Sequence, residues 1–455
     1  MRIPKLAIIG GGPGGLMTAY TLQKLANSPY ELTLYEASSR LGGKVLTAQF
    51  SHSAVRYEAG AAEFYDYSRF GGDPLKELIA ELGLPIRAMG GPAVVMNQRT
   101  VANLDDLVDQ ISPTTGEAVR RFDRLAKDWM TPAEFYHADG TSPHDEDSGL
   151  GGFARLLDRV EDPLARRYIT SMIHSDLATE PAQTNIVYGL QNYLMNDPAY
   201  MLLYAIEGGN ERLTESLAAR VEGQIRLGHR VASIGRHGAK LRVISSHPQG
   251  DHADEFDFVV VALPHNHLTG IEFQGERLAA AFRRHLAHYN YPAHYLRITL
   301  LFDKPFWRNT FADSYWMLDE FGGCCLYDES ARDPGNPHGI LGCLLGGDAA
   351  LEMSAWSDDQ LIGRILESLP PFLNAAQQTL LEGQVHRWIN AVNAMPGGAT
   401  AKSFDQRHVP EPIAHSNLFV VGDYLYDSTL NGVLDSAEYV AGWLAALMTE
   451  EVGRK

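Results

Sequence analysis

The sequence predicts an α/β fold in which a discontinuous Rossmann-like domain carries an inserted domain of mixed sheet and helices. Three observations support this prediction. The chain opens with an apolar strand that runs into a Gly-x-Gly-x-x-Gly spacing. Further apolar strands, of the kind that lie inside a parallel sheet, return near the middle and near the end of the 455 residues. The stretches between them follow other periodicities and therefore predict a second unit.

The opening stretch 5–20 reads KLAIIGGGPGGLMTAY and predicts a strand, a tight turn and a helix. Residues 6–9 are apolar, and Gly10, Gly12 and Gly15 follow them. Gly10 permits the turn, Gly12 lets the backbone approach a pyrophosphate, and Gly15 lets the helix pack against the strand. The N-terminus of that helix then faces the phosphate charge.

The second strand, ELTLYE, ends in Glu36, about twenty residues further on, where a carboxylate can accept the ribose hydroxyls. The run ASSRLGGK follows directly, and its two glycines between basic residues suit a second backbone approach to a pyrophosphate. Strand, glycines, helix, strand and terminal acid together indicate an adenine dinucleotide.

Two later segments point to the other end of the cofactor. YEAGAAEFY places Gly60 among small residues, against which a flat ring can lie. VVGDYLYDSTLNGVLDSAEY places Asp423 at a strand end, where it can accept ribityl hydroxyls. We expect a helix to start at about Leu434 and its N-terminus to face a flavin ring.

The bulk properties exclude several classes of partner. The chain has 38 basic and 56 acidic residues, so its net charge of -18 argues against nucleic acid and anionic membranes. No apolar stretch is long enough to span a membrane, and the first strand leaves no room for a signal peptide. The three cysteines, two of them adjacent, predict reduced thiols and a cytoplasmic protein. No Cys/His spacing indicates a zinc site, so we predict no metal, and the oligomeric state stays open.

The order of the elements predicts which stretches form which domain. The nucleotide-binding domain is expected to comprise residues 1–65, 206–274 and 386–455. The substrate domain is expected to comprise residues 66–205 and 275–385. Within it, residues 74–205 are predicted to be largely helical, and 137–152 a polar loop.

Taken together, these motifs resemble the flavin-dependent amine oxidase superfamily, which includes monoamine, polyamine, L-amino-acid and protoporphyrinogen oxidases and carotenoid desaturases. The resemblance spans the chain in family order and implies FAD, with a small-molecule substrate. By position it assigns cofactor contacts to Gly10, Gly12, Pro13, Gly14, Gly15, Glu36, Ala37, Arg40, Gly42, Gly43, Lys44, Gly60, Ala61, Ala62, Val231, Gly422, Asp423, Gly432 and Val433.

The resemblance also singles out residues near the reacting atoms. RITLLFDKPFW resembles the family's substrate-domain strand, and Arg297 stands where the family has a lysine that holds a water near flavin N5. A guanidinium stays charged and cannot act as a base, although it can hold water or a carboxylate. RWINAVNAMPGG resembles the segment that faces the flavin, so Trp388 matches a family tryptophan. Ala399 and Thr400 stand where covalent enzymes have cysteine and tyrosine, so we expect noncovalent FAD.

Two positions bear on the substrate. Glu63 replaces an arginine that grips the substrate carboxylate in amino-acid oxidases, so a cation would suit this site better; pairing with Arg69 is the structural alternative. Val433 stands where the family's aromatic cage has a tyrosine, and Tyr424 or Tyr426 could replace it.

Three classes of function are consistent with this sequence. We favour an FAD-dependent oxidase of an amine or amino acid, in which hydride moves from a C–H beside nitrogen to flavin N5 and O2 reoxidises the flavin. Glu63, Arg297 and Trp388 are its candidate catalytic residues. A desaturase or isomerase of a cyclic or polyene substrate is the alternative. A non-catalytic protein on the same fold is disfavoured by the intact glycines.

Overall fold

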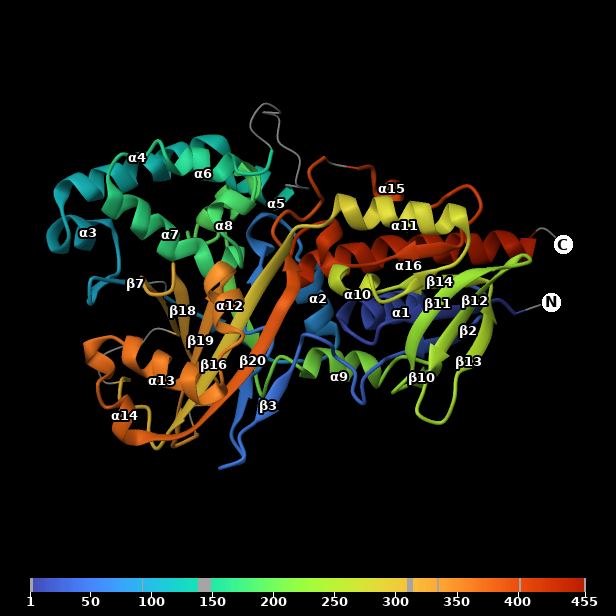
Figure 1. Ribbon diagram of the computed structural model, residues 1–455, viewed down its shortest axis with the longest axis horizontal. Coiled ribbons are helices and arrows are strands. Elements are labelled where there is room, and N and C mark those ends of the chain that lie inside the picture. The colour runs from blue at the N-terminus through green and yellow to red at the C-terminus, as the bar shows by residue number, and fades with distance from the viewer. Residues whose placement is uncertain are drawn as a thin grey trace.

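The computed structural model describes residues 3–91, 93–137, 149–308, 314–333, 335–400 and 402–453. Most of the loop predicted at 137–152 (residues 138–148) lies outside the described residues. Figure 1 shows an elongated molecule in which one end holds both termini and the other end holds most of the helices of the inserted segments. Two long strands, β16 (Pro292–Phe302) and β20 (Leu380–Asn393), run between these two halves.

The half that holds the termini is built on a parallel sheet. Its strand order is β10 (Gln224–Arg226), β2 (Glu31–Tyr35), β1 (Lys5–Ile9), β14 (Phe258–Val261) and β21 (Leu418–Val420). All four neighbouring pairs are parallel. The sheet therefore collects strands from the start, middle and end of the chain, which confirms the predicted Rossmann-like architecture.

Both faces of this sheet are covered, because alternate residues of a strand point to opposite sides. Leu6 and Ile8 of β1 pack in a cluster with α1 (Pro13–Leu25) and α16 (Leu430–Gly453). Ala7 and Ile9 pack in a second cluster with residues of another, smaller sheet. This two-sided burial explains why the strands read as continuous apolar runs.

The smaller sheet has the order β13 (His252–Phe256), β12 (Lys240–Ser246), β11 (Arg230–His237) and β15 (Glu272–Phe273). Its β11–β12 hairpin turns at Gly238, as predicted, with φ +62°. The helix α11 (Glu276–His288) packs onto it through Leu278 and Phe282. Since α11 falls in the stretch assigned to the substrate domain, we propose that this domain boundary lies after the helix.

The other half is built on a mixed sheet of order β20, β16, β19 (Gly339–Gly346), β18 (Cys324–Asp328), β17 (Tyr315–Leu318), β7 (Ala93–Met96) and β8 (Arg99–Val101). One face packs against α4 (Pro113–Trp129), α7 (Pro163–Leu177) and α8 (Ile186–Leu194). The opposite face packs against α12 (Gly347–Met353) and α13 (Asp358–Ser368).

Local sequence explains where several helices begin. Ser112 and Pro113 start α4, and Ser357 with Gln360 forms a capping box at α13. The remaining elements are β3 (Thr47–Gln49), β4 (Arg56–Glu58), β5 (Phe64–Asp66), α2 (Pro74–Glu81), β6 (Ile86–Met89), α3 (Leu104–Gln110), α5 (Pro132–His137), α6 (Gly152–Leu157), β9 (Leu202–Ile206), α9 (Arg212–Ala218), α10 (His265–Leu268), α14 (Ala376–Thr379) and α15 (Phe404–His408), with short 3-10 turns between some of them.

Two details differ from the sequence expectations. The stretch predicted to be largely helical also contains β6, β7 and β8, because β6 pairs with β9, β7 pairs with β17, and β8 pairs with β7. The last helix starts at Leu430 and not at about Leu434, since Asp427 Oδ1 accepts the Gly432 amide at 3.1 Å and caps an earlier turn. None of the helices in the described part of the chain is long and apolar enough to cross a membrane.

Candidate active site

The glycine loop after β1 has the close contacts that its sequence predicts. Gly10 has φ +111°, and a Cβ there would lie 2.3 Å from the Ala262 carbonyl oxygen. A Cβ at Gly15 would lie 1.9 Å from the Gly10 carbonyl oxygen. No side chain caps the start of α1 at Gly12, and Pro13 follows it. The first-turn amides of α1 therefore remain available to an anion such as a diphosphate.

Glu36 lies at this loop, as predicted. Its Oε2 accepts the Gly11 amide at 2.9 Å, and its Oε1 accepts the Ser38 amide at 2.7 Å. Each carboxylate oxygen has a further lone pair. Glu36, with Ala37 beside it, is therefore placed to accept ribose hydroxyls next to the helix N-terminus.

The second glycine pair lies against the first loop. The Gly42 amide donates to the Gly11 carbonyl at 2.8 Å, and a Cβ at Gly43 would lie 3.1 Å from Gly12 Cα. Arg40 curls back onto its own segment, because its Nη2 donates to the Gly43 carbonyl at 2.6 Å. The guanidinium thus holds the turn in shape.

Lys44 joins three segments that are far apart in sequence. Its Nζ lies 3.1 Å from Asp423 Oδ2 and also donates to the Ala391 carbonyl at 2.5 Å. The Ala61 amide donates to the Lys44 carbonyl at 3.1 Å, and a Cβ at Gly60 would lie 1.9 Å from that oxygen. The segments predicted to contact the pyrophosphate, the flat ring and the ribityl chain therefore meet.

Asp423 also faces a cavity of about 240 Å³ between the loop after β14 and the end of β20. Gly14 lies close to Val433, because a Cβ at Gly14 would be 3.5 Å from its Cγ1. Gly422, the residue before Asp423, donates its amide to Ser436 Oγ of α16 at 3.1 Å. Val231 is buried in the cluster behind the sheet. A free helix N-terminus, a carboxylate at the loop and the Lys44–Asp423 pair suit the phosphates and hydroxyls of FAD.

Two tyrosines considered for an aromatic cage are engaged elsewhere. The Tyr424 hydroxyl lies 3.0 Å from His285 Nε2, and the Tyr426 hydroxyl lies 3.1 Å from His408 Nε2. Burial lowers the pKa of both histidines, that of His408 to about 4, so both imidazoles are neutral at pH 7. These contacts fix both tyrosine rings by means of histidine partners.

Trp388 links the Gly60 segment to the mixed sheet. Its Nε1 donates to the Ala59 carbonyl at 2.7 Å, and its backbone lies opposite Tyr295 in the β16–β20 register. The Tyr295 hydroxyl in turn donates to the Asp176 carbonyl of α7 at 3.2 Å. This chain of contacts leads from the small residues at 60–62 into the inserted half.

A narrow interior cavity of about 10 Å³ lies at the end of this chain. It is lined by two carboxylates, an amide, three tyrosines and several soft apolar side chains. Its lining residues are Glu63, Tyr65, Asp176, Met195, Asn196, Met201, Leu203, Tyr315, Met317, Cys325 and Tyr327. Methionine side chains adapt their shape readily, so the walls can move apart around a ligand.

The two carboxylates are the distinctive feature of this cavity. Burial raises the pKa of Glu63, while the charge of Arg297 and a hydrogen bond from Tyr327 act in the opposite direction. Burial and the charge of Glu63 raise the pKa of Asp176 to about 8, against a hydrogen bond from Asn196. Glu63 Oε2 is buried without a hydrogen-bond partner among the described residues. Both acids are therefore placed to accept hydrogen bonds from a cation.

Arg297 is fully buried and ion-paired. Its Nη2 bonds Glu329 Oε1, and its guanidinium carbon lies 5.2 Å from the centre of the Tyr327 ring. Its Nε and Nη1 have no partner in the part of the chain that the structure describes. Since Tyr327 bonds Glu63, Arg297 lies one side chain behind the acidic cavity and retains two donors for a water or ligand.

The buried charges around the cavity do not balance. Four carboxyl groups lie among two guanidinium groups, so full ionisation leaves an excess of two negative charges: Glu58, Glu63, Asp176 and Glu329 against Arg297 and Arg332. The guanidinium charges of Arg297 and Arg332 both lower the pKa of Glu63. The raised pKa values of Glu58, about 7, and Asp176, about 8, reduce this excess through protonation, and a positively charged ligand would favour the ionised carboxylates.

Sequence reasoning named Glu63 as a candidate site residue but did not name Asp176, which lines the same cavity. The missed signal was helical spacing: Asp176 lies seven residues after Ile169 and three after Ile173, two buried residues of α7. An acid on the apolar face of a predicted helix indicates a buried polar site. Glu329 gave no such signal, because it lies in a short 3-10 turn whose position depends on the fold.

Comparison with known proteins shows the family to which the chain belongs. Residues 13–444 match the family of flavin-containing amine oxidoreductases. AofH of Mycobacterium tuberculosis, named provisionally as a flavin-containing monoamine oxidase, is 23% identical over 345 residues, 72% of each chain. The flavin-dependent L-tryptophan oxidase RebO of Lentzea aerocolonigenes is 25% identical over 299 residues, 60% of each chain.

Solved structures show the same fold at low identity. Putrescine oxidase bound to putrescine is 20% identical, with a TM-score of 0.70 over 99% of both chains. Cyclohexylamine oxidase from Brevibacterium oxydans IH-35A is 17% identical, with a TM-score of 0.72 over 98% of this chain and 100% of that one. The chain therefore belongs to the flavin-containing amine oxidoreductases and is an FAD-dependent oxidoreductase, with no cysteine after Gly397 and Gly398 to form a covalent bond to the flavin.

Proposed function

We propose that this enzyme oxidises a C–N bond of an amine that carries a second positive charge, such as a diamine. The observation that carries the proposal is the pair of carboxyl groups, Glu63 and Asp176, in one interior cavity. An ammonium group inserted between them would donate hydrogen bonds to the carboxylate oxygens. An amino acid would instead bring its own carboxylate into an acidic site.

The cavity walls would hold the substrate in a fixed orientation. Tyr65 and Tyr327 offer aromatic faces that attract a cation, and the neighbouring Met201 and Leu203 suit the methylene chain of an amine. A narrow cavity also excludes water, which strengthens the attraction between the acids and the ammonium. The amine at the far end of the substrate would then point toward the Gly60 segment.

The chemical step needs few further side chains. When bound, FAD supplies the hydride acceptor at flavin N5, and we propose O2 as the oxidant that regenerates it. Trp388, fixed by its bond to the Ala59 carbonyl, would form a wall beside the reacting carbon. Arg297 would hold a water or polarise the acidic cavity through its two unpaired donors. We also propose a cytoplasmic location, supported by three cysteines that are free thiols.

Three four-carbon probes of matched length test the substrate class. 1,4-Diaminobutane, butylamine and 4-aminobutanoate carry a positive, neutral and negative group at the end remote from the reacting amine. We expect the diamine to reduce the flavin under anaerobic conditions at the lowest concentration and the amino acid at the highest. A preference for 4-aminobutanoate, or bleaching only by a polyene or cyclic substrate, would contradict the proposal.

Glu63→Gln separates the cavity from a general electrostatic effect. Loss of one charge-assisted bond, worth about 1.5–3 kcal/mol, should raise KM for the diamine at least tenfold and leave KM for butylamine nearly unchanged. Glu352→Gln makes the same chemical change at an exposed position on α12 and should alter neither value. FAD content should stay at the wild-type level in both variants.

A further inference from the structure

Three histidines meet at one end of the small sheet behind the nucleotide-binding half. His229 directly precedes β11, His247 directly follows β12, and His252 is the first residue of β13. Neighbouring strands of this hairpin run antiparallel, so these three strand ends lie together. Ser245 shows the register, because it lies opposite both Val231 of β11 and His252 of β13.

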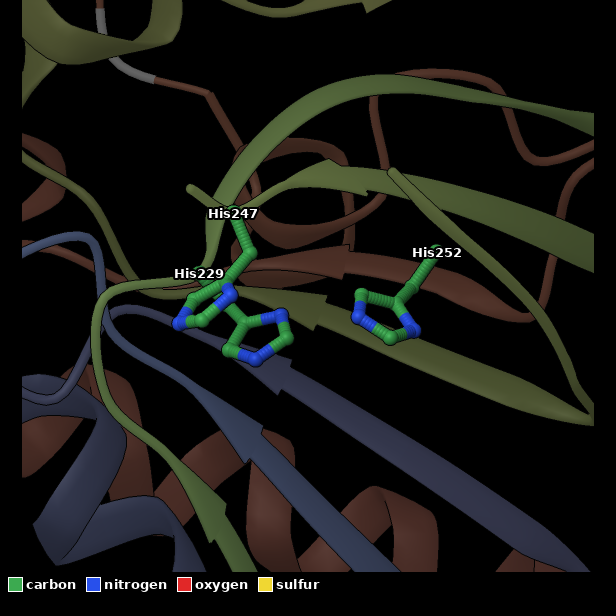
Figure 2. Close-up of side chains that lie close together, drawn as sticks. All are labelled: His229, His247 and His252. Carbon is green, nitrogen blue, oxygen red and sulfur yellow. The ribbon is translucent and has the colours of Figure 1, made fainter. Parts of the chain in front are cut away.

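The three imidazoles are close enough to share one ligand. One ring nitrogen from each lies within 4.8 Å of the others. The rings of His229 and His247 stack with centres 4.5 Å apart, and those of His229 and His252 lie 5.0 Å apart. Figure 2 shows the first two rings overlapping and His252 beside them, with the three side chains converging.

Side-chain rotations that open the stack of His229 and His247 would give this cluster the geometry of a metal site. Zinc–nitrogen bonds of 2.0–2.1 Å in a tetrahedron place the nitrogens about 3.4 Å apart, which these side chains can approach by turning about their own bonds. His247 is half-buried and directly precedes an exposed turn. Its Nδ1 accepts the Gln249 amide at 3.2 Å, a long hydrogen bond that coordination to a metal could replace. His229 Nδ1 lies 3.4 Å from Ser245 Oγ, a contact that helps to orient the ring.

An ion pair between Asp254 and Arg226 lies next to the imidazoles. Asp254 lies two residues after His252 on β13. Its Oδ2 accepts from Arg226 at 2.6 Å and from the Tyr35 hydroxyl at 2.8 Å, so this carboxylate is held in place. The exposure of His252 leaves the outer side of the cluster open to a water ligand.

We propose that His229, His247 and His252 bind one divalent transition-metal ion of the zinc class, with water in the fourth position. Imidazole nitrogen is a preferred ligand for such ions, and three of them with an open position form a known class of zinc coordination. The site is separate from the acidic cavity. It is joined to the cofactor loop by the backbone, since the His229 amide donates to the Glu36 carbonyl at 2.9 Å.

Metal titration of the FAD-loaded, full-length enzyme tests this proposal. Any affinity tag is removed first, the protein is dialysed against a chelator, and Zn²⁺ binding is followed by calorimetry and by elemental analysis. We expect one Zn²⁺ per chain and a higher melting temperature in its presence. His252→Ala and His247→Ala should each weaken binding at least tenfold and reduce the thermal shift.

His237→Ala is the matched control, because His237 lies at the other end of β11 and pairs with Glu255 at 2.6 Å. Its Zn²⁺ affinity should stay within twofold of the wild type. FAD content and circular dichroism check that each variant is folded. Absence of Zn²⁺ binding to the folded wild type, or unchanged affinity in a folded double variant of His247 and His252, would overturn the proposal.

Discussion

The glycine loop and the acidic cavity are formed in opposite ways. At the glycine loop the backbone makes the site: Gly15 lies so close to Gly10 that no larger residue fits. At the cavity the side chains make the site, with Glu63 from the segment after β4 and Asp176 from α7. A backbone site is readable from local spacing, whereas a side-chain site depends on which distant elements the fold brings together.

The two sites also differ in how the protein stabilises their carboxyl groups. Glu36 at the glycine loop accepts two backbone amides, so its carboxylate is stabilised without a cation. Asp176 in the cavity is enclosed beside another carboxylate, and its pKa rises to about 8. The Glu36 carboxylate is therefore stabilised by the backbone alone, whereas under the proposed function the ionised form of Asp176 would be stabilised by a bound cation.

Gly15→Ala gives the largest effect that this comparison predicts. The added Cβ would lie 1.9 Å from a backbone oxygen, so α1 must separate from β1 and FAD binding should be lost. Gly442→Ala is the control: it lies in α16 with nothing within 4 Å of an added Cβ, and it should stabilise the helix by up to about 1 kcal/mol. FAD absorbance per chain and thermal melting measure both. Wild-type FAD content in Gly15→Ala would show that the close packing is dispensable.

Arg297→Met tests the buried ion pair behind the cavity. It leaves Glu329 buried without its guanidinium partner, so unfolding free energy should fall by about 3–5 kcal/mol. A second change, Glu329→Gln, removes the unpaired charge and should restore much of that loss. Denaturant unfolding of the FAD-loaded proteins measures both values, and full stability in the single variant would contradict the pair's structural role.

The same Arg297→Met variant tests the catalytic assignment. We expect one half-reaction to slow at least tenfold, about 1.4 kcal/mol of barrier. Stopped-flow mixing separates anaerobic reduction by the amine from reoxidation by O2. If both rates remain within twofold of wild type in the FAD-loaded variant, Arg297 has no role at the flavin.

Glu36→Ala tests the cofactor side with a smaller expected loss. Removing a carboxylate that would bond the ribose should weaken FAD binding by about 1.5–3 kcal/mol, or roughly tenfold to a hundredfold. Glu31→Ala is the control, because Glu31 lies at the other end of β2 in an exposed salt bridge to Lys5. This substitution should leave the FAD affinity unchanged. Fluorescence of released flavin on dilution measures both, and equal release would mean that Glu36 does not hold the cofactor.

The pH dependence of diamine binding is the mildest test. Below about pH 8 the Asp176 carboxyl is protonated and must lose its proton to bind an ammonium. The diamine Kd should therefore fall as pH rises from 6 to 8, by up to about tenfold per unit, and level off above pH 8. Asp176→Asn should remove that component while the ionisation of the diamine itself remains.

The same group gives a stability prediction with a definite sign. The folded pKa of Asp176 lies above its unfolded value, so the folded state holds a proton that the unfolded chain has released between about pH 4 and 8. Its contribution to stability therefore decreases as pH rises through that window. Asp176→Asn should make the substrate-free enzyme less sensitive to pH there, and an unchanged slope in denaturant unfolding would place the carboxyl in a more polar setting.

The two regions differ in how far sequence could predict them. Gly10, Gly15 and Glu36 were predicted individually, because the turn, the close packing and the strand end each impose a local requirement. The roles of Arg40 and Val231 could not be predicted in the same way. Arg40 donates to the Gly43 carbonyl and also lies 3.6 Å from Glu211, and Val231 packs behind the sheet. The Glu211 contact and the packing of Val231 depend on segments from elsewhere in the chain.

By itself, the sequence determined the nucleotide-binding architecture, the resemblance to flavin-dependent amine oxidases and the acid at position 63. These follow from short-range spacing and from the few residues that can occupy a tight backbone turn. Only the tertiary structure decided that Asp176 joins Glu63, that Arg297 pairs with Glu329, and that three histidines meet at one sheet end. Such encounters join residues tens to over a hundred positions apart, or strand ends whose register depends on pairing, and no local pattern specifies them.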